Sequence, residues 1–164
     1  MPSNVPAKSR RTSAATVQRR LPPLLRRAWY GLNQSFRQRI THLKITPDQF
    51  SILRWLSEGD PAGLTQREIT DLMASDPNTI TSTLARMEQA GLISRAPHEK
   101  DRRAHRVRLR AKGAKTFGEA GKIALSLQRD IVTALPEARR ARFLEELATI
   151  AEACVAASEK MQSR

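Results

Sequence analysis

The sequence predicts a mainly α-helical protein with one small β-hairpin. Apolar residues recur at helical spacing in six separate segments of the 164-residue chain. Aromatic residues make up only 4% of the chain, and Leu, Ile and Ala supply much of the apolar content, which favours packing between helices. A segment beginning at Arg106 alternates with period two instead, as a strand does. The expected order is four helices, two strands and two further helices.

The first two helices are expected at 22–42 and from residue 47 onward. The first begins at Pro22-Pro23, and its apolar stripe consists of Leu24, Leu25, Ala28, Trp29, Leu32 and Phe36. Thr46 suits the N-cap of the second, Pro47 its first position, and Gln49 could close a capping box. The glycines and proline of 59–63 should end this helix.

Two shorter helices are expected at 65–73 and 76–90. Thr65 and Glu68 form a second capping box, and Asp76-Pro77 begins the next helix. Gly91 should end that helix in a left-handed conformation. The inward faces are expected to consist of Ile69, Leu72 and Met73 in one helix and of Ile80, Leu84 and Met87 in the other.

A hairpin is expected next, with strands at 92–95 and 106–110 and a polar turn at 97–105. Val107 and Leu109 should share one face of the second strand, with three arginines on the other. Two short helices followed by a basic hairpin predict a winged helix-turn-helix. In that fold one helix can enter the DNA major groove while the hairpin, or wing, reaches the backbone or the minor groove.

The last two helices are expected at 113–135 and 137–160. The final helix has an apolar face that includes Phe143, Leu147, Ile150, Cys154 and Val155. Such faces are too large for a small domain to cover, so we expect a homodimer, although packing within one chain is the alternative. Cys154, the only cysteine, is expected to be a buried, unreactive thiol and not a redox sensor.

The net charge predicts a polyanionic partner. The chain has 29 basic and 16 acidic residues, for a formal charge of +13. Residues 1–20 carry five basic residues and no acid, and we interpret them as a flexible basic arm, although an ordinary solvated terminus is the alternative. No apolar run approaches the roughly 20 residues that span a bilayer, so nucleic acid is favoured over a membrane. A cytoplasmic, nucleoid-associated protein is expected.

The densest positive charge falls on the expected wing. Residues 95–115 contain nine basic and two acidic side chains, more than half of the net charge. We expect this hairpin to contact DNA through residues including Arg102, Arg106 and Arg108. The positive end of the helix before it is expected to suit phosphate. Polar residues near this end are expected to face outward and to contact phosphates or base edges, although an ordinary solvated helix face is the alternative. These residues are Asn78, Thr79, Thr81, Ser82, Thr83 and Arg86.

Several short motifs together resemble the MarR family of regulators. They are Leu64-Thr65-Gln66, Thr79-Ile80-Thr81, the segment Met87-Glu88-Gln89-Ala90-Gly91-Leu92-Ile93, and Asp101-Arg102-Arg103 before Val107-Arg108-Leu109. The resemblance covers about 24–160 and is strongest at 46–113. It implies an intertwined homodimer in which Arg103 enters the minor groove and Asp101 orients it. The alternative is an Asp–Arg pair that only orders the hairpin.

The resemblance also implies a small aromatic or anionic effector. Such effectors bind between the dimer helices and the DNA-binding lobe. The corresponding candidate residues are Trp29, Phe36, His42, Phe50, Arg54 and Trp55. The alternative for each is an ordinary core or surface residue.

No sequence pattern points to catalysis, a metal or a cofactor. His42, His98 and His105 are scattered, and neither a Gly-rich phosphate loop nor an evident nucleophile–base pair occurs. The sequence thus predicts an arm at 1–20, dimerisation regions at 21–45 and 112–164, and a winged helix-turn-helix at 46–111. The expected function is a homodimeric, ligand-responsive repressor on a pseudo-palindromic double-stranded DNA operator. The alternatives are a sequence-independent, chromosome-organising protein and a protein-interaction module, and the arginine-rich wing counts against the latter.

Overall fold

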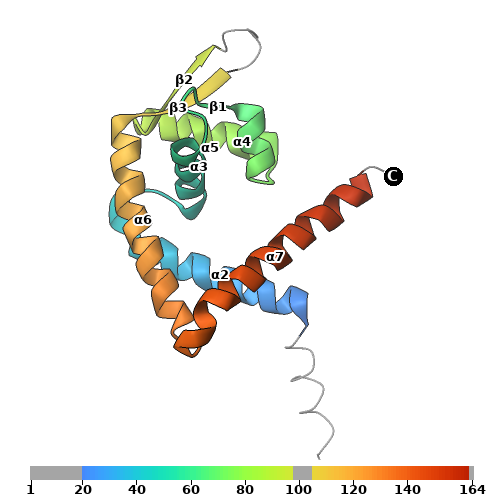
Figure 1. Cartoon of the computed structure of the whole chain (residues 1–164). Helices are drawn as coiled ribbons and strands as arrows, with labels where there is room; N and C mark the ends of the chain where they lie inside the picture. Colours follow the sequence, from blue (N-terminus) through green and yellow to red (C-terminus); the bar gives the residue numbers. More distant parts are fainter. Residues whose placement is uncertain (1–19, 98–104, 163–164) are drawn as a thin grey trace, which may run out of the picture. The chain divides into compact units, whose positions relative to one another are not determined.

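The computed structural model describes residues 20–97 and 105–162 and confirms a mainly helical fold with a small sheet. The described chain divides into two compact units, one ending at Ile123 and the other beginning at Ala124. The elements can be followed in Figure 1. The helices are α2 Leu21–Arg39, the 3-10 turn η1 Thr41–Leu43, α3 Pro47–Glu58, α4 Gln66–Leu72, α5 Pro77–Gln89, α6 Ala111–Val132 and α7 Glu137–Gln162. The strands are β1 Leu64–Thr65, β2 Ile93–Pro97 and β3 His105–Leu109.

Local capping signals set the start of three helices, as the sequence predicted. At α3, the Thr46 hydroxyl accepts a hydrogen bond from the Gln49 amide, and the Gln49 side chain accepts one from the Thr46 amide. Thr65 and Glu68 form the same reciprocal pair at α4. Asp76 accepts a hydrogen bond from the Thr79 amide at 2.9 Å and so caps α5. These caps satisfy amides that a helix start leaves without partners.

The sheet has three antiparallel strands in the order β1-β3-β2. The strand β1 was not predicted, because two residues are too few to show a period of two. Its Leu64 lies opposite Val107 in the central strand. Just before it, Gly63 has a φ of 89°, and a Cβ there would lie 2.3 Å from the Val107 carbonyl oxygen. Only glycine allows the chain to pass so close to β3.

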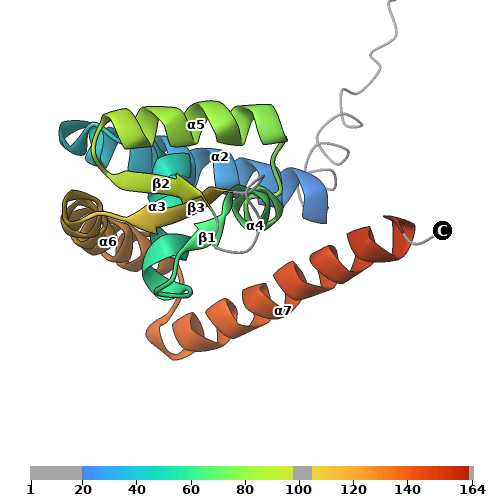
Figure 2. The same cartoon turned by 90° about the horizontal axis from the view of Figure 1, so that it is seen from above.

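The core of the first unit lies between the small sheet and helices α3, α4 and α5. Figure 2 shows α5 lying over β2, against which it packs, while α3 packs against β3. Ile80, Leu84 and Met87 are buried, which confirms the inward face of α5. Leu72 was predicted to face inward and is instead 43% exposed, because α4 ends there. The largest fully buried side chains are Ile40, Ile52, Leu53, Ile69, Leu84, Met87, Ile93 and Val107.

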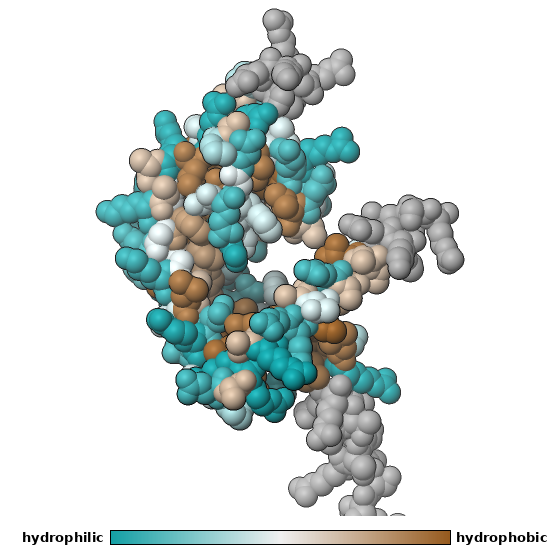
Figure 3. Space-filling view, in the orientation of Figure 1, coloured by the Kyte–Doolittle hydropathy of each residue, from teal (hydrophilic) through white to brown (hydrophobic). Residues whose placement is uncertain are grey.

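The second unit contains the end of α6 and the long helix α7. From Glu137 to Ser158, α7 is exposed at every position except half-buried Arg140. Figure 3 shows apolar side chains reaching the surface along this helix. The prediction of a buried Cys154 is wrong for the single chain, where the thiol is exposed along with the apolar face around it. No helix in the described residues combines the length and apolar character needed to cross a membrane.

Candidate nucleic-acid interface

The outer face of α5 carries short polar side chains near its N-terminus. Asn78, Thr79, Thr81 and Ser82 are exposed there, as is Arg86 one turn later. The prediction that Thr83 also faces outward is wrong, because its side chain is only 6% exposed. Thr83 lies three residues after Ile80 and four before Met87, so it shares their buried stripe. Its hydroxyl accepts a hydrogen bond from Arg86 Nη2 at 3.3 Å.

The N-terminus of α5 carries a fixed negative charge. Hydrogen bonds from Thr79, first from its hydroxyl and then from its amide, lower the pKa of Asp76 below its ordinary value. The ionised carboxylate stabilises the positive end of the helix dipole. Because this carboxylate also repels phosphate, the tip of α5 is poorly suited to the DNA backbone. The exposed polar side chains beyond it are better placed for base edges.

An ion pair joins α5 to the wing. Glu88 lies 2.7 Å from Arg95 Nη2 of β2, and its second carboxylate oxygen accepts a hydrogen bond from the Arg95 amide at 3.0 Å. The Arg95 side chain is the main cause that lowers the pKa of Glu88, against an opposing effect of burial. This pair fixes the first wing strand to the last turn of α5. It also neutralises one of the positive charges counted on the wing, an effect that the charge pattern of the sequence does not show.

Replacing Glu88 with glutamine should therefore destabilise the protein in a pH-dependent way. Because folding lowers the carboxyl pKa from 4.5, its stabilising effect is complete above that value and is lost as the pH falls through the lower folded-state pKa. We expect Glu88→Gln to lower the free energy of unfolding by about 1 kcal/mol at pH 7, and by less below pH ~4.5. Urea unfolding at several pH values measures this.

The matched control is Glu58→Gln, which removes a more exposed ion pair. Glu58 lies 3.0 Å from Arg54 Nε within α3, and the side chains of this pair are 50% and 59% exposed. We expect its loss to cost only ~0.3–0.5 kcal/mol. Equal losses for the two variants would contradict the proposed clamp between α5 and the wing.

Three further positively charged side chains near the wing donate hydrogen bonds to backbone carbonyls. Arg106 Nη1 donates to the Gly63 carbonyl at 2.8 Å, and Arg108 Nε donates to the Ala62 carbonyl at 2.9 Å. Lys112 donates to the Ala90 carbonyl at 2.7 Å, at the end of α5. The prediction that the arginines of the second strand form one outward face is therefore wrong for Arg106, which is half-buried against the loop before β1. Each of these bonds thus joins a basic side chain to a backbone carbonyl of the loop before β1 or of the end of α5.

The expected wing tip lies outside the described residues. Asp101, Arg102 and Arg103 fall within 98–104, so their assigned roles stay predictions from the sequence.

The structure separates the candidate effector residues. Phe36 and Phe50 meet edge to face with ring centroids 4.9 Å apart, and Phe50 stacks on Phe117 at 5.6 Å. This cluster joins α2, α3 and the start of α6. Trp55 is 38% exposed on α3. His42 is exposed in η1, and Arg54 is paired with Glu58.

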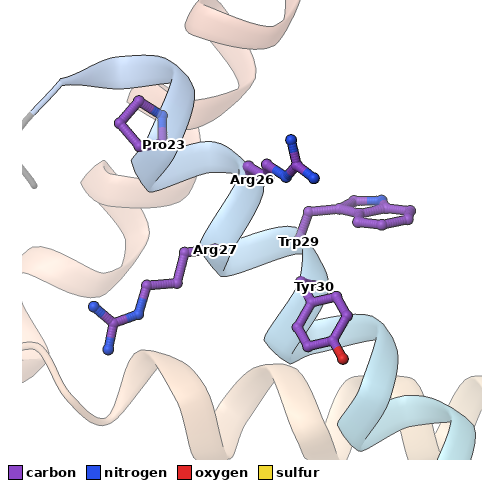
Figure 4. A pocket seen from close by; sticks show the side chains of 5 residues that line it. All are labelled: Pro23, Arg26, Arg27, Trp29 and Tyr30. Atoms are coloured by element: carbon purple, nitrogen blue, oxygen red, sulfur yellow. The ribbon is translucent and has the colours of Figure 1, made fainter.

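Trp29 lies apart from that cluster, in a shallow hollow along α2. The hollow has a volume of about 380 Å³ and is lined by Pro23, Arg26, Arg27, Trp29 and Tyr30 (Figure 4). Trp29 and Tyr30 are 64% and 61% exposed, respectively. The basic and aromatic side chains suit an aromatic anion, but the hollow contains only one of the six candidates. Within residues 20–97 and 105–162, no three His, Cys, Asp or Glu side chains are grouped closely enough to hold a metal ion.

Comparisons with known proteins place this geometry in a family. Residues 45–105 match the model of the MarR family. The chain is 30% identical over 95 residues to the HTH-type transcriptional regulator PecS of Dickeya dadantii, a match covering 57% of each chain. It is 27% identical over 127 residues to the transcriptional regulator HosA of Escherichia coli, covering 74% of this chain and 93% of HosA.

One solved structure has the same fold and a sequence similar to that of this chain. The transcriptional repressor CouR, bound to a 23-mer DNA duplex, superposes with a TM-score of 0.73 and 30% identity. The superposition covers 82% of this chain and 94% of CouR. With its three-stranded sheet, capped helix pair and basic wing, the chain belongs to the MarR family of winged helix-turn-helix transcriptional regulators.

Proposed function

We propose that the chain is a homodimeric repressor that binds a specific double-stranded DNA operator in the cytoplasm. The observation that carries this proposal is the exposed polar face of α5, with Asn78, Thr79, Thr81 and Ser82 next to a cationic wing. Short side chains let a helix approach base edges in the major groove. The similar repressor CouR was solved with a DNA duplex, which supports the same partner here. Residues 46–111 would bind DNA.

The proposed dimer rests on the exposed apolar side chains of α7. Within that helix Phe143, Leu144, Leu147, Ile150 and Val155 are between 36% and 57% exposed. A long helix with no buried face gains little stability from its own propensity and needs tertiary packing. A second copy of the chain is the simplest partner, with 21–45 and 112–164 forming the dimerisation region. Two copies would read a pseudo-palindrome.

We further propose that a small aromatic anion relieves repression. The hollow around Trp29, with Arg26 on the same side of α2, supports a ligand of this chemistry (Figure 4). Such a ligand would act by favouring a dimer whose α5 helices are wrongly spaced for the operator. Displacement of the selected operator by a panel of small aromatic acids tests this part.

Selection of bound DNA from a random pool is the experiment that tests DNA recognition. We expect the full chain to select a pseudo-palindrome with half-sites about 10 base pairs apart. Arg103→Ala should weaken binding to the selected operator about tenfold while leaving the melting temperature and the dimer unchanged. Equal affinity for random and selected DNA at matched salt would instead favour the sequence-independent binder that the net charge of +13 also allows.

A further inference from the structure

Two hydrogen bonds fix the direction in which the Thr81 hydroxyl of α5 donates its proton. Thr81 Oγ1 lies 2.7 Å from the Pro77 carbonyl oxygen and 2.7 Å from Gln66 Nε2. A carbonyl oxygen can only accept, so the single hydroxyl proton of Thr81 must point to Pro77. Gln66 must then donate through its amide nitrogen. The contact with Pro77 therefore determines that the side-chain nitrogen of Gln66, and not its oxygen, faces Thr81.

Gln66 is held in place by the start of α4. It is the first residue of that helix, directly after the capping residue Thr65. Gln66 is half-buried, and its backbone carbonyl accepts a hydrogen bond from the Thr70 hydroxyl at 2.8 Å. Because α4 packs against α5, the amide reaches across to a residue fifteen positions later. Gln66 was not among the residues expected to matter for DNA binding.

With these two bonds in place, the Thr81 hydroxyl can bind a further partner only as a hydrogen-bond acceptor. A hydroxyl has one proton and two lone pairs. The proton is used by Pro77 and one lone pair by Gln66, so one lone pair remains on an exposed side chain. Phosphate oxygens, guanine O6 and N7, and thymine O4 are all acceptors and cannot bond to it. The exocyclic amino groups of adenine and cytosine are the donors in the major groove.

We propose that Thr81, whose proton is held by the Pro77 carbonyl, is a specificity-determining acceptor that reads an adenine or cytosine amino group. Gln66 is the positioning residue, because its donation to one lone pair fixes the direction of the other. This proposal rests on the proposed function, since it needs α5 in the major groove. It adds the class of base recognised and the residue that orients the acceptor. At one position of each half-site, the strand facing Thr81 should carry A or C and not G or T.

The test removes single amino groups from the operator selected by the full chain. Each adenine of a half-site is replaced in turn by purine and each cytosine by pyrimidin-2-one, which lack only the exocyclic amine. We expect wild-type affinity to fall about tenfold at one of these positions. With Thr81→Val, of similar shape but without the hydroxyl, removing that amine should change affinity less than twofold.

Two further variants separate base reading from a structural role. Gln66→Met keeps a side chain of similar length but cannot donate to Thr81. It should reduce the tenfold discrimination to about threefold or less, while the melting temperature of the free protein stays within about 2 °C of wild type. Thr116→Val is the matched control, because Thr116 makes the same bond to a carbonyl four residues earlier, Lys112, at 2.9 Å in α6. It should keep full discrimination.

The outcomes distinguish this inference from the proposed function. A defined operator with no effect of any amine, or a Thr81→Val variant that keeps the wild-type discrimination, overturns the inference and leaves the proposed function standing. A random pool that yields no preferred sequence overturns both.

Discussion

Replacing Gly113 with alanine should destabilise the protein by roughly 2–4 kcal/mol. A Cβ at this position would lie 2.1 Å from the Leu92 carbonyl oxygen and 2.9 Å from Leu109 Cδ1. The first contact is with backbone, and Leu92 is also held by a hydrogen bond from the Arg110 amide at 3.0 Å. The first turn of α6 must therefore move away from Leu92, the residue before β2. Chemical unfolding of the full chain at fixed concentration measures the loss.

The control for Gly113 is another glycine of the same helix. A Cβ at Gly118 meets nothing within 4 Å, so alanine there gains helix propensity without a clash. We expect Gly118→Ala to stabilise the protein by up to about 1 kcal/mol. The two substitutions should thus differ in sign. A stabilising effect of Gly113→Ala would contradict the close seating of α6 on Leu92.

Operator affinity should fall roughly 10³- to 10⁵-fold between 50 and 200 mM salt, as for a protein that neutralises about 6–10 phosphates. The physical reason is the release of counterions from DNA by the basic side chains of 95–115. Titration of a labelled operator at several salt concentrations gives the slope of log K against log salt.

Variants that each remove one positive charge show which side chains contribute to the slope of log K against log salt. Arg86 is exposed on α5, and Arg86→Gln should reduce the slope by about one. Arg142 lies 2.8 Å from Glu146 within α7, so its charge is already balanced, and Arg142→Gln should leave the slope unchanged. A slope near zero for the wild-type chain would contradict electrostatic binding to the backbone.

Features decided by neighbouring residues could be predicted from the sequence. The capping pairs Thr46–Gln49 and Thr65–Glu68 lie within one helical turn, so both partners appear together in the chain. Gly91, with a φ of 73°, ends α5 for the same local reason. Helix starts and ends were therefore predicted to within a few residues.

Features decided by distant partners could not be predicted. The contact between Arg106 and the Gly63 carbonyl joins residues 43 positions apart, and an alternating pattern does not show which arginine folds back. Thr83 was placed on the wrong face because threonine suits either a buried or an exposed position, whereas Ile80 and Met87 identify themselves by hydrophobicity. The partnership of Gln66 with Thr81 likewise depends on how α4 packs against α5.

The carbonyl contacts of the wing limit how this chain can diverge. A positive charge alone can be supplied by lysine, so most basic positions of the wing should drift freely between lysine and arginine. Arg108 instead donates to the Ala62 carbonyl through Nε, where a lysine has a carbon atom, and Arg106 donates to the Gly63 carbonyl through Nη1, one bond beyond the position of a lysine ammonium. At these two positions we therefore expect relatives with the same loop to retain arginine, because lysine would supply the charge without a donor at the same point.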